Sequence, residues 1–120
     1  FIRMEILVAP IPEENIASWK AWATQLQEGE EFKEQMNRMK LTRHDAWLAH
    51  SPGGPVVVVV WEGEGEKEFL ANMMASDHPA DKAHLKKAGQ LHGVDFDAPP
   101  PSDAPPTPEL VLDSQAMRFV

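Results

Sequence analysis

The chain has 120 residues, of which 42% are hydrophobic and 25% charged, so it has the size and composition of one globular domain with a modest core. Nineteen acidic against eleven basic residues give a net charge of −8, which argues against a nucleic-acid partner because phosphate-backbone binding depends on a basic face. The absence of cysteine excludes disulfides, thiolate metal sites and cysteine nucleophiles.

The first third of the chain predicts a strand followed by a long helix. Residues 2–9 (IRMEILVA) are apolar and rich in β-branched side chains, which favours a strand that the following prolines close. A helix is expected from Glu13, and Gly29 interrupts it before its pattern resumes at Phe32. The apolar face of this helix consists of Ile16, Trp19, Trp22, Ala23 and Leu26.

The middle of the chain predicts a β-hairpin and then two helices. Residues 41–50 (LTRHDAWLAH) and 56–61 (VVVVVW) indicate strands, because a proline- and glycine-rich turn separates them. One helix is expected near Glu66, and another begins at Pro79 and ends at Gly93. The apolar side of the last helix consists of Ala80, His84, Leu85, Ala88, Leu91 and His92.

The composition changes after Phe96. Residues 97–108 (DAPPPSDAPPTP) contain six prolines and no large apolar side chain, which indicates an extended connector. Strand-like character returns at residues 110–112 and 116–120. We therefore expect an α+β domain over residues 1–96 and a connector with a terminal strand over residues 97–120. The resulting βαββαβ order predicts a ferredoxin-like fold, whose antiparallel sheet carries helices on one face.

The run of five valines at residues 56–60 predicts a homodimer. Successive strand residues point to opposite faces, so both faces of this strand favour burial, whereas the helices cover only one. Burial of apolar surface contributes about 25 cal/mol per Å², so leaving two or three valines exposed would lose a few kcal/mol of stabilisation. We expect a second subunit to cover the other face, with residues 97–120 reaching across to it. The alternative for this arm is a flexible tail.

The sequence favours a cytoplasmic location without membrane attachment. No apolar run approaches the roughly 20 residues that span a bilayer. The N-terminal residues Phe1–Met4 lack the basic segment, apolar stretch and small-residue cleavage site that a signal peptide would show.

Three stretches carry a resemblance to a known family: IRMEILVAPIPEE, LTRHDAWLAHSPGGPVVVVVWEG and SDHPADKAHLKKAGQLHGVDF. Together they resemble small proteins of the dimeric α+β-barrel superfamily, which includes the antibiotic-biosynthesis monooxygenases. The resemblance covers about residues 2–98 and implies a ferredoxin-like fold, a dimer, and a pocket between sheet and helices in each subunit. It implies no particular reaction, because this superfamily hosts many.

Histidine is the residue type to weigh for catalysis, because it titrates near neutrality. His44, His78 and His92 are the candidate acid–base residues, and Asp77 could orient His78. His44 lies in the pocket only if the Leu48 face of its strand meets the helices. Each has a structural alternative. His44 could be a hydrogen-bonded interface or core residue, Ser76 or Asp77 could simply cap the helix with His78 exposed, and His92 could make a helix-dipole contact.

The candidate substrate-binding residues are Trp47, Trp61, Arg43 and Asn72. If the Trp47 face of its strand meets the helices, Arg43 enters the pocket. The related cofactor-free monooxygenases use Asn, Trp, Tyr and Arg, but this chain has no tyrosine, so the set is incomplete. The tryptophans could hold a flat aromatic ligand, and their alternative role is core and dimer packing.

No metal site is predicted within one element. His84 and His92 are about 12 Å apart along a helix, and His44 and His50 about 20 Å apart along a strand, whereas zinc ligands lie about 2 Å from the metal. We expect no cofactor, with haem bound through His84 or His92 as an alternative.

These observations predict a small-molecule enzyme of the monooxygenase, isomerase or cyclase type. It would act on a hydrophobic or aromatic substrate in a pocket between sheet and helices. The alternative is a non-catalytic dimer that binds a ligand or stabilises a partner.

Overall fold

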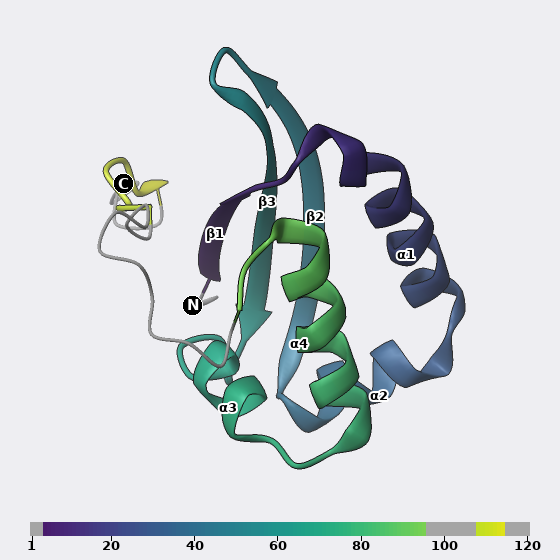
Figure 1. Cartoon of the computed structure of the whole chain (residues 1–120). Coiled ribbons are helices and arrows are strands. Elements are labelled where there is room, and N and C mark those ends of the chain that lie inside the picture. The colour runs from purple at the N-terminus through teal and green to yellow at the C-terminus, as the bar shows by residue number, and fades with distance from the viewer. Residues whose placement is uncertain (1–3, 96–107, 115–120) are drawn as a thin grey trace.

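The computed structural model describes residues 4–95 and 108–114. In chain order its elements are β1 (Met4–Pro10), the 3-10 turn η1 (Glu13–Asn15), α1 (Ile16–Glu28), α2 (Glu30–Arg38), β2 (Leu41–Ser51), β3 (Gly54–Gly63), α3 (Phe69–Ala75) and α4 (Pro79–His92) (Figure 1).

The three strands form one antiparallel sheet in the order β1-β3-β2. Val59 pairs with Leu7 on one side and with Ala46 on the other, so β3 is central. The predicted hairpin is confirmed, and its turn ends at Gly54, whose positive φ of 119° favours glycine. The sheet therefore presents two faces, one containing Leu7 and Val59 and the other their immediate neighbours in each strand.

The helices lie together over one face of the sheet (Figure 1). Two hydrophobic clusters join the layers. One contains Met39, Leu41, Trp61, Phe69 and Met73, and the other Ile11, Trp19, Val57 and Leu91. The amphipathic patterns that predicted the helices thus supply this core.

Gly29 interrupts the first long helix as predicted. Its backbone is extended (φ −98°, ψ 152°), and it ends α1 and precedes α2. This break gives α2 its own direction, so α1, α2 and α4 can surround a common space (Figure 1).

The expected terminal strand is not found where the structure describes it. Residues 110–112 lie in no strand, and their side chains are 72%, 86% and 84% exposed. An apolar triplet alone favours a strand only when a partner edge pairs with it. Residues 97–107 and 116–120, which carried the rest of that prediction, lie outside the described residues. The described part is thus an α+β fold with three strands and four α-helices.

Within residues 4–95 and 108–114, no helix is long and apolar enough to span a membrane.

Candidate functional site

A pocket of about 450 Å³ lies between α1, α2 and α4. Trp22 and Leu26 of α1 and Phe32 of α2 give it apolar walls. Its polar wall atoms come from residues that include Gln35 of α2 and His84 and Lys87 of α4. This size and this mixture are typical of small-molecule sites, which are largely apolar with a few fixed polar groups.

His84 links the pocket to an aromatic cluster beneath it. Its ring centroid lies 4.9 Å from that of Trp22 and 6.2 Å from that of Phe32, against which it is stacked. His44 of β2 lies behind, 6.1 Å from the His84 ring and 5.1 Å from the Phe32 ring. Phe69 contacts His44 edge-on at 5.3 Å. Two histidines therefore share one largely aromatic environment.

Both imidazoles are neutral at physiological pH. Burial lowers the pKa of His44 from 6.5 to about 4, and charge repulsion from His84 adds to this effect. Burial also lowers the pKa of His84 to about 4, although the charge of Asp81 opposes the shift. The buried Nδ1 of His44 has no hydrogen-bond partner. Such orphaned buried atoms are uncommon and often mark a functional site or a bound water.

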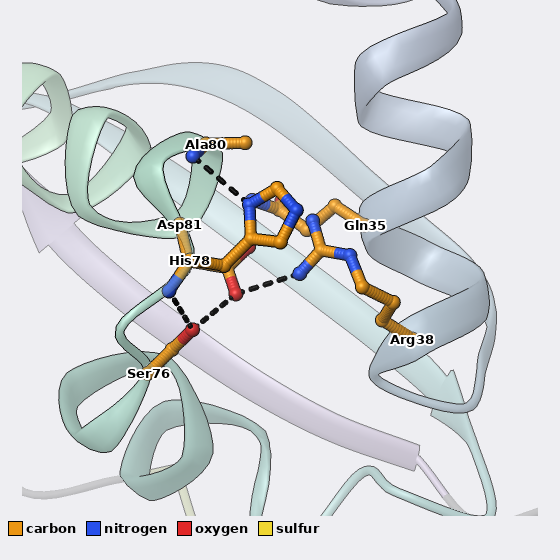
Figure 2. A network of polar contacts seen from close by, with 6 residues as sticks. All are labelled: Gln35, Arg38, Ser76, His78, Ala80 and Asp81. Carbon is orange, nitrogen blue, oxygen red and sulfur yellow. Dashed lines mark hydrogen bonds and ion pairs between the residues drawn. The ribbon is translucent and has the colours of Figure 1, made fainter.

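Asp81 is the centre of a polar network beside the pocket (Figure 2). Its side chain is 0% exposed. Its Oδ1 accepts a hydrogen bond from Gln35 Nε2 (2.9 Å), and its Oδ2 accepts from Arg38 (2.8 Å) and from the Ser76 hydroxyl (2.6 Å). Burial on its own raises the pKa of Asp81, but these hydrogen bonds and the Arg38 charge outweigh it and lower the pKa below its usual value. Asp81 is therefore an ionised carboxylate that ties α2 to the start of α4.

Of the predicted acid–base residues, His44 is the one that lies beside the pocket residues His84 and Phe32. His78 caps α4, where its exposed ring accepts a hydrogen bond from the Ala80 amide (3.1 Å; Figure 2). Asp77 is fully exposed, with Lys82 Nζ at 3.9 Å. His92 Nδ1 lies 2.8 Å from the Pro10 carbonyl oxygen. The structure does not bring these last three together with the pocket.

The four predicted substrate-binding residues lie apart from the pocket wall. Trp61 is buried in the core below His44, with its Nε1 donating to the Glu66 carbonyl (2.7 Å). Trp47 and Arg43 lie on the opposite face of the sheet. Trp47 is 51% exposed there, and Asn72 is exposed on α3. Of the two faces of strand 41–50, the one that contains Leu48 therefore meets the helices, since Leu48 packs against the cluster of Ile11, Trp19, Val57 and Leu91.

The helical pattern placed both His84 and His92 on the apolar side of their helix, and we expected His92 rather than His84 to line the pocket. The contact between His84 and Trp22 joins segments far apart in the chain, so helical spacing alone could not choose between them. Gln35 had no signal, because it lies in the polar run EEFKEQMNR.

Within residues 4–95 and 108–114, no group of three or more metal-ligating His, Cys, Asp or Glu side chains occurs. Of the two histidines considered for haem, His84 lines the pocket, whereas His92 contacts a backbone carbonyl.

Comparisons with protein-family models, curated proteins and solved structures found no match for this chain. Inference about its function therefore rests on the site itself.

Proposed function

We propose that this protein is a small-molecule enzyme that binds a hydrophobic or aromatic substrate between α1, α2 and α4 and moves a proton through His84. The observation that carries the proposal is a histidine held neutral in an aromatic pocket. A neutral imidazole can accept a proton at one nitrogen, and perturbed histidines in clefts are frequent acid–base groups.

The low pKa narrows the chemistry that His84 can perform. A base with a pKa of about 4 removes only acidified protons, such as an activated C–H or an enol hydroxyl, and returns them readily. Isomerases and cyclases use such steps, which fits the expected reaction types. Trp22 and Phe32 would hold a planar substrate against the imidazole. His44, behind it, is itself neutral and would keep the surroundings of His84 free of charge on that side.

A nitrobenzisoxazole tests this proposal, because it is a planar aromatic carbon acid. A base removes its ring C–H proton, the N–O bond breaks, and a coloured cyanophenolate forms. We expect the protein to accelerate this elimination over buffer, and His84→Ala to reduce the rate at least about tenfold. The control is His50→Ala, which removes an exposed histidine at the far end of β2. An equal rate in wild type and His84→Ala would refute the acid–base role.

The alternatives give different results in the same assays. If the protein binds ligands without catalysis, the nitrobenzisoxazole should quench Trp22 fluorescence but should not be converted to the cyanophenolate. A haem protein would develop a Soret band on titration with haem, and the band would be lost in His84→Ala. Absence of any spectral change would remove the haem alternative.

We further propose that the sheet face opposite the helices pairs with a second copy in a homodimer. This face carries Ile6, Val8, Val58 and the half-exposed Trp47, and its edge carries Arg43 within 3.5 Å of Asp45 and 3.6 Å of Glu62. An apolar centre with both charges at the rim can match itself across a two-fold axis. The valine run that predicted the dimer supplies part of this face.

Sedimentation at micromolar concentration tests the dimer. We expect a species of twice the 13.4 kDa chain mass, and Trp47→Glu should shift it to the monomer. The exposed substitution Gln27→Glu on α1 is the control. A wild-type species of 13.4 kDa would contradict the dimer. We also propose that the chain has the full ferredoxin-like βαββαβ layout, in which residues 116–120 would supply the last strand.

A further inference from the structure

Lys87 is the one residue with a permanent positive charge among the described residues that line the pocket. It is exposed, so it lies where the pocket opens to solvent. Within the described parts of the chain no carboxylate forms an ion pair with its ammonium, whereas the charge of Arg38 is neutralised by Asp81. The charge of Lys87 is therefore available to a bound ligand.

Lys87 and His84 belong to one face of α4. They are three residues apart, which on a helix places their Cβ atoms about 5–6 Å from each other on the same side. Ala80 and Ala83 line the same pocket from the preceding turn, and their small side chains leave room for a ligand along this face. A ligand that contacts the His84 imidazole here is therefore within reach of the Lys87 ammonium.

A base as weak as His84 requires stabilisation of the negative charge that proton removal creates. When it takes a proton from a carbon next to a carbonyl group, the electron pair of the C–H bond forms an enolate with its charge on the oxygen. A pKa of about 4 gives little driving force for this transfer. Cations and hydrogen-bond donors at the developing oxyanion are the usual means of lowering such a barrier. Return of the proton to a different carbon completes an isomerisation and restores neutral His84.

From this arrangement we infer that Lys87 is the oxyanion-binding residue of the site and that the substrate is an aromatic carbonyl compound. The Lys87 ammonium donates a hydrogen bond to the oxygen that gains charge while His84 holds the proton. Glu31 lines the same pocket from α2, and its carboxylate repels an oxyanion. The carbonyl oxygen therefore faces the α4 wall. The inference rests on the proposed function, since it assigns a second catalytic residue and a substrate class to the same pocket.

The nitrobenzisoxazole elimination tests the inference, because its product carries a new oxyanion. The ring C–H proton passes to His84, the electron pair of that bond forms the nitrile, and the N–O bond breaks with its electrons on the phenolate oxygen. We expect Lys87→Met to lower kcat about tenfold with KM nearly unchanged, since the neutral substrate gains this charge only during the reaction. Lys87→Arg, which keeps a cation, should retain most of the rate. The control is Lys86→Met, which removes an exposed charge of α4 that does not line the pocket.

A matched pair of binding probes gives a readout that does not depend on turnover. Naphthoate and naphthamide share a ring system and nearly share a shape, but only naphthoate carries a negative charge. We expect naphthoate to bind the full chain about fivefold more tightly at low salt, measured by quenching of tryptophan fluorescence. The preference should shrink as salt is added, because Lys87 is exposed. It should vanish in Lys87→Met and persist in Lys86→Met.

The outcomes distinguish this inference from the proposed function. If Lys87→Met is as fast as the wild type while His84→Ala is slow, the inference is overturned and the acid–base role of His84 stands. Equal losses of kcat in Lys86→Met and Lys87→Met also overturn it, because the effect would then be one of overall charge. If the wild type shows no acceleration, the proposed function fails, and the naphthoate preference decides whether Lys87 binds an anion. Equal wild-type affinity for the two probes overturns that role as well.

Discussion

Acidification from pH 7 to pH 5 should destabilise this protein by about 4 kcal/mol through His44 and His84. The unfolded chain binds a proton at each histidine below an ordinary pKa of about 6.5, whereas the folded pKa of each is about 4. At pH 5 each site is about 97% protonated when unfolded and about 10% protonated when folded. The stability that neutral burial provides is thus present above pH 6.5 and is lost as pH falls toward 4.

The magnitude follows from these populations. Proton linkage gives about 2 kcal/mol for each histidine between pH 7 and pH 5, a large part of the 5–15 kcal/mol typical of a domain. Asp81 does not contribute in this window, because the stability that its lowered pKa provides is lost only as pH falls below its ordinary value of about 3.8. Two histidines therefore account for the expected loss.

Urea denaturation at pH 7, 6 and 5 measures the effect. In His44→Phe, which suits the aromatic surroundings, the fall in the free energy of unfolding should be about half that of the wild type. In the double variant His44→Phe, His84→Leu, the free energy of unfolding should hardly change between pH 7 and pH 5. The control is His50→Ala, which should show the same fall as the wild type. A wild type whose stability is the same at pH 7 and pH 5 would refute the burial of neutral histidines.

Two further predictions concern the framework around the pocket. Asp81→Ala should lower the free energy of unfolding by about 3 kcal/mol, because it leaves Gln35 and Arg38 without their buried acceptor. Urea denaturation beside the exposed Asp77→Ala measures this, and equal losses in the two variants would contradict it. Gly65→Ala should cost about 2 kcal/mol or more, because its Cβ would overlap the carbonyl oxygen of residue 39, whereas Gly53→Ala meets open space. A thermal melt that ranks these two variants equally would show that the close approach is not required.

The described fold was largely predictable because its signals are local. Residues 56–60 and the turn before them specify the hairpin through side-chain type and turn chemistry alone. Gly29 marked the break between α1 and α2 for the same reason. Residues 110–112 had the composition of a strand, but composition cannot supply a partner edge, and the described segment has no strand there.

The site was less predictable because it depends on contacts between distant segments. His44 was a candidate from its strand, but its neighbours Phe32 and His84 come from two different helices. Helical periodicity put His84 and His92 on one side and could not show that one meets Trp22 and the other a backbone carbonyl. Periodicity identifies the apolar face of a helix, but it does not identify the residues that pack against that face.

The most direct test of the central claim is an NMR titration of the His84 imidazole in the intact protein. With a pKa of about 4, His84 should remain about 90% neutral at pH 5, and its ring resonances should shift when naphthol, a planar aromatic probe, is added. His44→Phe should leave the pKa of His84 low, because burial is the main cause of its shift. A His84 that is mostly protonated at pH 5, or that does not respond to naphthol, would contradict a neutral histidine in an aromatic ligand pocket.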